Sequence, residues 1–253
     1  MNYVGLYTLL QKETRRIFRI PGQTVLSPLI SATLYIFIFG HVIGGRISDF
    51  NGVPYITFVF PGILMLNIIS SSFAHSSSSV YFARFVKSIE ELLVSPLTYF
   101  EIVVGYVAGG IVRALIVAFG ILIVGLLFGA VTLTNIFAFI FYVIAISTVF
   151  SLLGILVGLW AMGFEQLGSI NIFVITPLTY LGGIFYSISM LPVSVQIFTL
   201  SNPFFYFVDG IRSSMIGVSE ANTMVGFAMI TALIMSLGWL VTHLFYIGWR
   251  IRP

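Results

Sequence analysis

The charged residues of this chain that could act on a partner gather in one short stretch, residues 81–96. Apolar side chains recur there mostly at spacings of three and four: Phe82, Phe85, Ile89, Leu92 and Leu93. Charged side chains lie between them: Arg84, Lys87, Glu90 and Glu91. This spacing predicts a short amphipathic helix with an apolar side and a charged side. Such a helix can bind another protein through its charges, or it can be a solvated cap between its flanking segments.

Groups for covalent or metal chemistry are sparse. The three histidines, His41, His75 and His243, lie in separate apolar segments with no carboxylate beside them, and the chain has no cysteine. We therefore expect no metal site, and packing or interfacial roles for the histidines. The sequence has no Gly-x-Ser-x-Gly motif and no acidic pair within an apolar segment. These absences leave no expected catalytic residue.

An ATPase site of the chain's own is not expected either. Lys87 is its one lysine followed by Ser or Thr, and Val86 precedes it where a phosphate-binding loop requires glycine. The apolar segments also lack the central carboxylates with which ion-driven transporters usually relay charge. If the chain pumps a substrate, a partner must therefore supply the energy, and ATP and Mg²⁺ would be bound by that partner.

One cation, Arg113, falls deep inside an apolar segment. Burying it costs about 3 kcal/mol or more unless it is paired or reaches water, so it should face the interior of a helix bundle. A structural partner would explain it: a backbone carbonyl, or a carboxylate such as Glu101 or Glu165. A substrate headgroup would explain it as well.

The composition indicates an integral membrane protein. Of the 253 residues, 59% are hydrophobic and 8% are charged, and the mean hydropathy is +1.11. Soluble domains carry about a quarter charged residues. The net charge of +3 comes from cations that cluster beside apolar segments, so no nucleic-acid partner is implied.

The apolar segments predict an all-α fold, with residues 1–253 forming a single transmembrane domain of six spanning helices. A segment must be about 20 residues long to cross a hydrocarbon core of roughly 30 Å. The expected spans are 24–43, 55–80, 99–128, 135–160, 167–186 and 225–249. A polar turn, 44–52, which contains Arg46 and Asp49, joins the first two. The fifth should kink at Thr176-Pro177 and Gly182-Gly183.

Two further segments are expected to lie in the membrane surface or to dip into it. Residues 2–20 place apolar side chains on one helical face and cations on the other, which is typical of an interfacial helix. The cations are Lys12, Arg15, Arg16 and Arg19. Residues 187–220 are too apolar for a loop and too interrupted to span, which predicts a re-entrant segment of two short helices broken at Asn202-Pro203.

Small residues are abundant in the second and fourth spans. The second carries seven serines and His75, which indicates either close helix packing or a polar lining for a translocation path. Gly-x-x-x-Gly occurs at four places and favours close helix packing, although a chain with 24 glycines contains such spacings by chance: Gly40/Gly44, Gly105/Gly109, Gly125/Gly129 and Gly154/Gly158.

The distribution of cations predicts the orientation. Six spans place both termini on one side of the membrane, and eight cations fall on that side: Lys12, Arg15, Arg16, Arg19, Arg84, Lys87, Arg250 and Arg252. Arg46 and Arg212 fall opposite. The positive-inside rule then places both termini and residues 81–96 in the cytoplasm. Residues 187–220 would face outward. Within this segment, Asp209 lies three residues before Arg212 and can pair with it on one helical face.

Four stretches resemble a known family. They read EELLVSPL at 90–97, LGGIFYSISMLP at 181–192, Asn202-Pro203, and DGIR at 209–212. In them the chain is similar to the type-2 ATP-binding-cassette (ABC) exporter permeases, and GYVAGGIVR at 105–113 fits their YadH-like bacterial inner-membrane branch. The resemblance covers essentially the whole chain. It departs at Ser187, where many relatives have proline, and this leaves the local turn open.

The resemblance implies a homodimeric permease in the bacterial inner membrane, surrounded by lipid, with two cytoplasmic ATPase subunits on separate chains. Residues 81–96 would hold the coupling helix, and Arg84, Lys87, Glu90 and Glu91 would contact the ATPase. Residues 187–220 would form the outer gate. Its gate residues would be Pro192, Pro203, Phe204, Phe205, Tyr206 and Phe207.

Two other kinds of function compete with an ATP-driven export permease. An intramembrane enzyme that modifies lipid would need a reactive constellation of side chains, and a passive channel or scaffold would need no energy source. A serine-bearing interior with aromatic residues near the exit fits a lipid, a hydrophobic drug and a lipid-linked glycan equally well.

Overall fold

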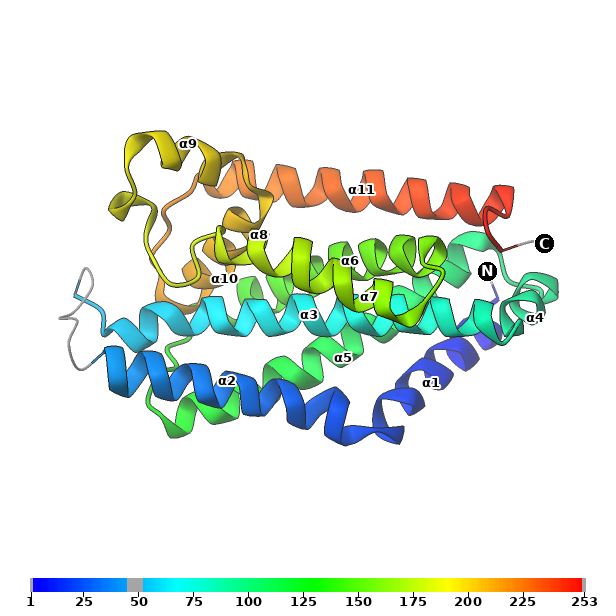
Figure 1. Cartoon of the computed structure of the whole chain (residues 1–253), viewed down its shortest axis with the longest axis horizontal. Helices are drawn as coiled ribbons and strands as arrows, with labels where there is room; N and C mark the ends of the chain where they lie inside the picture. The colour runs from blue at the N-terminus through cyan, green and yellow to red at the C-terminus, as the bar shows by residue number, and fades with distance from the viewer. Residues whose placement is uncertain (1, 45–51, 252–253) are drawn as a thin grey trace.

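The computed structural model of the chain describes residues 2–44 and 52–251, without the side chain of His41. The described chain is helical almost throughout, and its long helices run side by side as a bundle (Figure 1). Among these described residues, five helical segments are long and apolar enough to cross a membrane: Gly22–Gly40, Tyr55–Phe85, Tyr99–Leu127, Ile136–Trp160 and Thr223–Ile247. The predicted turn 44–52, with Arg46 and Asp49, lies outside the described residues apart from its two end glycines.

The first of these segments follows directly from α1 (Tyr3–Arg19). It consists of the π-helical turn η1 (Gly22–Leu26), α2 (Ser27–Phe37) and a second π-helical turn, η2 (Ile38–Ile43). α1 is amphipathic in its contacts: Leu9 and Ile17 are buried against the bundle, while most of its cations are exposed. That α1 lies along a membrane surface stays a prediction.

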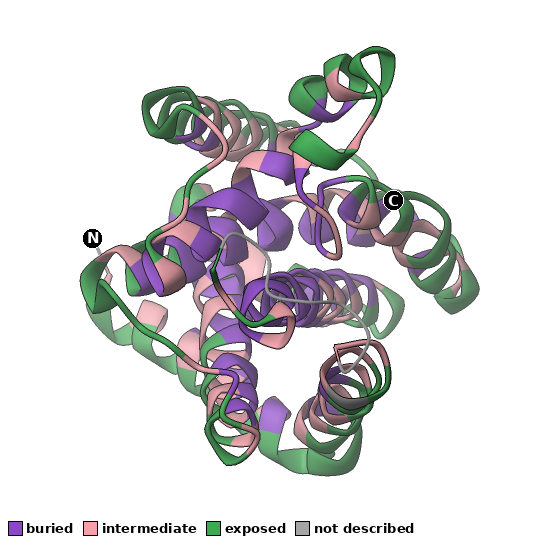
Figure 2. Cartoon of the chain, turned by 90° about the vertical axis from the view of Figure 1, so that its left-hand side faces the viewer, coloured by how far each residue is buried: buried purple, intermediate pink, exposed green. Residues whose placement is uncertain are grey.

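Helix α3 (Tyr55–Phe85) forms the centre of the bundle, and 89% of its most apolar window is buried. It packs against α5 (Tyr99–Leu127) and α6 (Ile136–Trp160). Figure 2 shows the buried residues concentrated in the middle of the bundle and the exposed ones around its rim. The outer helix α11 (Thr223–Ile247) has only 17% of its window buried, as expected where apolar side chains face lipid or another subunit.

Helices α3 and α6 approach each other through glycines. A Cβ atom at Gly154 would lie 2.6 Å from the carbonyl oxygen of Phe73, and one at Gly158 would lie 2.7 Å from that of Ser77. Both distances are too short for any side chain, so the two backbones are in direct contact. The Gly-x-x-x-Gly spacing at these positions therefore does reflect the close packing that the sequence favoured.

The fifth predicted span, 167–186, is shorter than expected. α7 (Phe164–Ile170), the π-helical turn η3 (Asn171–Ile175) and α8 (Thr176–Tyr180) form one continuous run that ends in a turn after Tyr180. A π-helical turn just before Pro177 accommodates the proline, which lacks a backbone donor. The run is not among the five long apolar segments, so a sixth crossing stays a prediction.

The segment before the last span contains the two predicted short helices. α9 (Val193–Ser201) and α10 (Pro203–Ile216) meet at Asn202, whose side chain accepts a hydrogen bond from the Phe204 amide at 3.0 Å. A single 3₁₀ turn, η4 (Ile188–Met190), precedes them. This confirms the break at Asn202-Pro203, whereas its re-entry into the membrane stays a prediction.

The charged stretch 81–96 is divided between two helices. Residues 81–85 complete α3, and α4 (Ser88–Val94) is a separate short helix. Lys87 adopts the left-handed conformation, with φ of 58°, and this turns the chain between them. α4 lies at the same end of the bundle as both termini, and α9 lies at the opposite end (Figure 1).

We expect Gly154→Ala to destabilise the protein, because the added methyl group would force α3 and α6 apart. Overpacking of this kind costs about 1–3 kcal/mol. Thermal unfolding of the purified protein in detergent should show a lower midpoint than wild type. Gly168→Ala is the matched control, since a Cβ atom there meets nothing within 4 Å. Equal midpoints for Gly154→Ala and wild type would show that the close approach does not stabilise the bundle.

Candidate functional site

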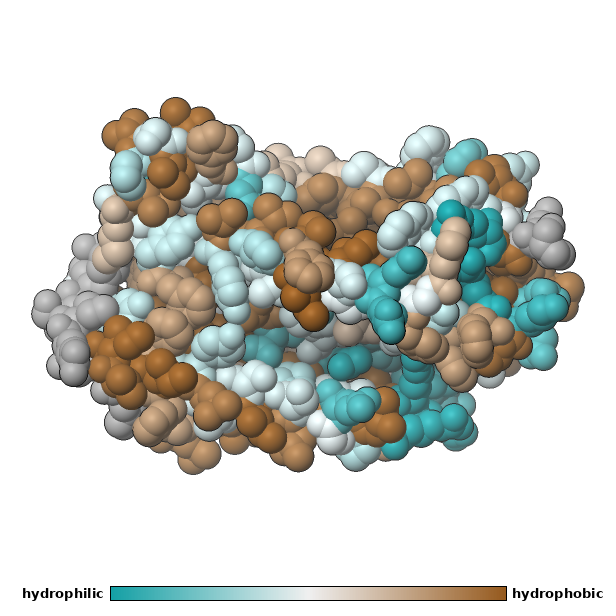
Figure 3. Space-filling model, in the orientation of Figure 1, coloured by the Kyte–Doolittle hydropathy of each residue, from teal (hydrophilic) through white to brown (hydrophobic). Residues whose placement is uncertain are grey.

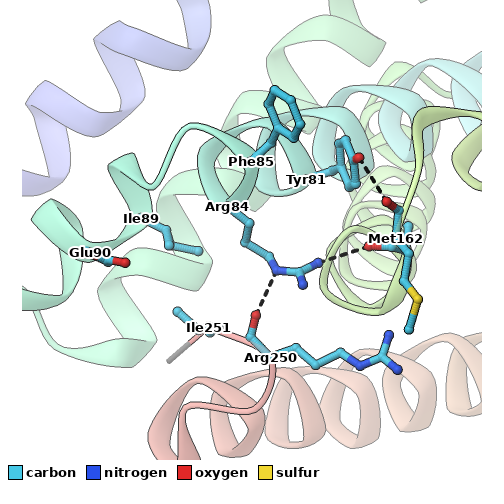
Figure 4. Close-up of a pocket in the computed structure, with 9 residues that line it drawn as sticks. Tyr81, Arg84, Phe85, Ile89, Glu90, Met162, Arg250 and Ile251 are labelled. Atoms are coloured by element: carbon cyan, nitrogen blue, oxygen red, sulfur yellow. Dashed lines mark hydrogen bonds between the residues drawn. The ribbon is translucent and has the colours of Figure 1, made fainter. Parts of the chain in front are cut away.

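A groove opens at the α4 end of the bundle. Its volume is about 340 Å³, and it lies between the end of α3, α4, the link that follows α6 and the C-terminal residues (Figure 4). Two cations and one carboxylate line it: Arg84, Arg250 and Glu90. Tyr81, Phe85, Ile89 and Met162 supply apolar surface. A groove with both charges and an exposed aromatic ring, that of Phe85, is suited to receive side chains of a protein partner.

Arg84 holds the walls of this groove together. Its Nε donates to the Arg250 carbonyl at 2.9 Å, and its Nη1 donates to the carbonyls of Gly158 at 2.9 Å and Ala161 at 3.2 Å. The guanidinium thus connects the end of α3 with the end of α6 and with the C-terminal residues (Figure 4). Since these donors are directed at internal carbonyls, Arg84 mainly shapes the groove.

Other contacts reinforce the same wall. The Tyr81 hydroxyl donates to the Met162 carbonyl at 3.3 Å, and its ring packs edge-on against Phe164 with centroids 4.6 Å apart. The Arg250 guanidinium donates to the Trp160 carbonyl. The link after α6 is therefore fixed to α3 on one side and to the C-terminal residues on the other.

The remaining predicted coupling residues lie on or beside α4 and are exposed. Lys87, Glu90 and Glu91 are accessible, whereas Ile89 is buried beneath them. Glu90 and Glu91 lie in the first turn of α4, where carboxylates are favoured by the positive end of the helix dipole. The predicted amphipathic character is therefore present over one short helix, with its carboxylates exposed and Ile89 buried.

The residues predicted for the outer gate divide into two groups. Phe204, Phe205 and Phe207 are buried, and the rings of Phe204 and Phe207 pack against Phe150 with centroids 5.2 Å and 5.8 Å away. Tyr206 and Pro203 are half-buried, and Pro192 is exposed. In this structure Phe204 and Phe207 form a closed core with Phe150, and the Phe205 ring contacts Tyr206 instead; buried rings suit a seal more than an open lining.

Arg212 fastens α10 to the turn after α8. Its side chain is 0% exposed, and its guanidinium lies 4.0 Å from the centroid of the Phe58 ring on α3. Nη2 donates to the Gly183 carbonyl at 2.7 Å. Burying a cation is favourable only with such compensation.

The predicted pairing of Asp209 with Arg212 is wrong. The carboxylate within 4.0 Å of Arg212 belongs to Glu220. Asp209 instead accepts hydrogen bonds from the backbone amides of Glu220, at 2.7 Å, and Ala221, at 3.2 Å. The spacing of three allows a pair, but the loop after α10 offers Asp209 unpaired backbone donors, and these take up its oxygens.

A buried carboxylate that the sequence reasoning missed anchors α1. Glu13 is 1% exposed, and its Oε2 accepts from the Ser79 hydroxyl at 2.6 Å and lies 3.2 Å from the His75 Nε2. Arg16, one turn on, donates to the Ser78 hydroxyl at 3.1 Å. Glu13 lies three residues after Leu10 and four before Ile17, within the apolar face of residues 2–20. That position was the signal that could have revealed it.

The predicted carboxylate partners do not pair with Arg113. Glu101 accepts from the Asn2 amide at 2.7 Å and from the Thr98 amide at 2.8 Å, and Glu165 is exposed. Arg113 is half-buried, and its Nε has no hydrogen-bond partner among the described residues.

Within residues 2–44 and 52–251, no group of three or more His, Cys, Asp or Glu side chains could hold a metal ion. His75 faces Glu13, as above, and the His243 ring stacks on Trp239 with centroids 5.4 Å apart. His243 thus packs against a neighbour as expected, whereas His75 contacts a carboxylate that the sequence did not place beside it. The side chain of His41 lies outside the described residues.

Comparisons with known proteins place these features in a wider group. A family model described as ABC-2 type transporter matches residues 4–216. The inner membrane transport permease YadH of Escherichia coli (strain K12) is 38% identical over 236 residues, which cover 92% of this chain and 91% of that protein. Nodulation protein J of Rhizobium leguminosarum bv. viciae is 28% identical over 207 residues, covering 79% and 77% of the two chains. The region that the family model matches contains α4, α10 and all of α1 except its first residue.

We expect Glu13→Gln to change how stability depends on pH. Burial alone would raise the pKa of the Glu13 carboxyl, but the contact with His75, the hydrogen bond from Ser79 and the charge of Arg16 lower it below its ordinary value. The carboxylate therefore contributes stability above the pKa it has in the unfolded chain, and this contribution is lost as the pH falls through the lower folded value.

The check is the thermal midpoint of both proteins between about pH 7 and about pH 4. Glu13→Gln should be less stable than wild type at neutral pH, and the difference should shrink on acidification. Glu91→Gln, at an exposed carboxylate of α4, should follow the wild-type curve. Parallel curves for Glu13→Gln and wild type would contradict the anchoring role.

Proposed function

The chain belongs to the ABC-2 type transporter family and is the membrane permease subunit of an ABC transporter, and we propose that it exports its substrate by docking a separate ATPase at α4. Family membership implies such an ATPase partner. The observation that carries the docking proposal is the cluster of exposed charges on α4 beside a groove of about 340 Å³. The names of the relatives give no support to a lipid-modifying enzyme or a passive channel.

The charges of α4 are the proposed recognition surface. Glu90 and Glu91 are exposed on a helix whose buried face holds it against the bundle. Lys87 extends the charged surface at its start. Complementary charges on the ATPase would orient the two subunits, while the groove would receive an apolar or aromatic side chain. In this arrangement Arg84 acts mainly by holding the groove in shape.

Transmission from the ATPase to the bundle is proposed to run through α3. Arg84 connects the end of α3 to α6 and to the C-terminal residues, so a displacement of α4 would act on all three together. At the other end of α3, Phe58 lies under Arg212 of α10. A Cβ atom at Gly62 would lie 2.9 Å from the Ile184 Cα atom, so the turn after α8 rests directly on α3. Such tight contacts favour movement of the permease as rigid bodies.

The outer gate is proposed to consist of α9, α10 and the turn before them. These elements lie at the end of the bundle opposite α4 (Figure 1). The buried phenylalanines of α10 would seal the exit, with Tyr206, Pro203 and Pro192 at its edge. Opening would require the rings of Phe204 and Phe207 to move away from Phe150. The free-energy cost of exposing their apolar surface would keep the resting state closed.

The proposed topology has six crossings, an interfacial α1 and a re-entrant segment at 187–220. Both termini and α4 would face the cytoplasm of a bacterial cell, since the cations gather at that end and the Escherichia coli relative is named an inner membrane permease. A second copy of the chain would complete the translocation path. The apolar outer faces of α2 and α11 leave surface for this copy and for lipid.

Charge reversal on α4 tests the docking proposal. Glu90→Lys with Glu91→Lys should abolish co-purification with the cognate ATPase and reduce stimulated ATP hydrolysis at least about tenfold, because like charges would face each other across the interface. The measurements are affinity co-purification and the ATPase rate of the complex in proteoliposomes.

Glu165→Lys is the matched control, since it reverses an exposed carboxylate outside α4. It should retain both the complex and the rate. An α4 double variant that still binds its ATPase and stimulates hydrolysis like wild type would show that α4 is not the docking element.

A further inference from the structure

A second cavity, separate from the groove beside α4, lies between α1 and the junction of α3 with α4. Its volume is about 530 Å³. One wall is a stripe of four cations on α1: Lys12, Arg15, Arg16 and Arg19. The other wall carries the hydroxyl groups of Ser79 and Ser88 and the ring of Phe82. We call this cavity the basic pocket.

The charge of the basic pocket is strongly positive. Its one carboxylate, Glu13, is already engaged by the Ser79 hydroxyl and by His75. The four cations follow at intervals of three, one and three residues, so they project from one side of α1. Four cations around one cavity repel one another, and an anion between them would relieve this repulsion.

The cationic wall is held in a fixed position. Leu9, Glu13 and Ile17 are buried beneath it. α1 also lies directly on glycines of α5: a Cβ atom at Gly109 would lie 2.7 Å from the Glu13 Cβ atom. A rigid backbone beneath the cations means that less freedom is lost when they bind a ligand.

The surroundings of the pocket indicate the chemical class of the anion. α1 leads directly into the first segment that is long and apolar enough to span a membrane, which starts at Gly22, so its cations would lie where the chain enters the membrane. Phe82 and Ile20, both about half exposed, add apolar surface to the pocket. Figure 3 shows hydrophilic residues gathered toward this end of the bundle, next to hydrophobic ones. A phosphate group attached to an apolar chain matches both surfaces.

We propose that the basic pocket binds the phosphate headgroup of an anionic phospholipid from the membrane leaflet in which α1 lies. Arg15 and Arg19, the exposed arginines of the stripe, contact the phosphate, and Phe82 contacts the acyl chains. Bound lipid bridges α1 to the α3–α4 junction and so stabilises the joint next to the proposed coupling helix. The site is independent of nucleotide and of the ATPase, so its test stands apart from that of the docking proposal.

The test is native mass spectrometry of the full-length chain titrated with phosphatidylglycerol and with phosphatidylcholine that has the same acyl chains. Wild type should retain phosphatidylglycerol in preference to phosphatidylcholine. Arg15→Gln should weaken phosphatidylglycerol binding about tenfold, the loss expected for one charge-assisted hydrogen bond. Arg15→Lys should restore most of it, and Arg19→Gln should repeat the loss at a second position.

Lys87→Gln is the control, because it removes the same charge near this end of the bundle from a residue that does not line the pocket. If it weakens binding as much as Arg15→Gln, or if phosphatidylcholine binds equally well, the attraction is a diffuse surface effect and the proposal fails. Glycerol 1-phosphate, the headgroup without chains, should not bind at the same concentrations. Equal binding of glycerol 1-phosphate would overturn the assignment to lipid.

Discussion

The direct backbone contact between α3 and α6 is the constraint on which the rest of this structure depends. Within a membrane, apolar surface gives helices no preference for each other over lipid, so association relies on close packing and polar contacts. Gly154 and Gly158 permit that closeness. Ser72 and Ser78 of α3 return their hydrogen bonds to their own helix, to the Ile68 carbonyl at 2.8 Å and the Ala74 carbonyl at 2.6 Å, and Ser79 donates to Glu13 of α1. α3 is therefore buried along most of its length with several of its hydroxyl groups paired.

A buried central helix has a functional consequence, because it contacts the elements at both ends of the molecule. One end reaches Arg212 and the turn after α8, and the other carries Arg84 and leads into α4. Both cations are directed at carbonyl oxygens of neighbouring segments. Arg84 fastens the end of α6 to α3, and Arg212, which lies over the Phe58 ring of α3, fastens α10 to the turn after α8. In the proposed exporter, this continuity is what lets a small cytoplasmic helix influence a distant outer gate.

Local patterns predicted most of the fold. The long apolar segments, the break at Asn202-Pro203 and the charged character of α4 depend on neighbours along the chain, and the sequence contains that information. Contacts between segments far apart in the sequence could not be predicted from such local patterns. The contact of Glu13 with His75 joins residues 62 apart, and Asp209 prefers backbone amides that become available only when the following loop folds back. The length of α8 depends on where the chain turns at Gly182-Gly183, which composition alone did not determine.

The central claim is that α4 lies on the cytoplasmic face, where an ATPase can reach it. The chain has no cysteine, so a single Glu91→Cys substitution provides a unique label site. Reaction with a membrane-impermeant maleimide, compared between right-side-out and inside-out membrane vesicles, reports its side directly. We predict labelling only in inside-out vesicles, and protection when the ATPase is bound. Labelling of Glu91→Cys in right-side-out vesicles would contradict the account.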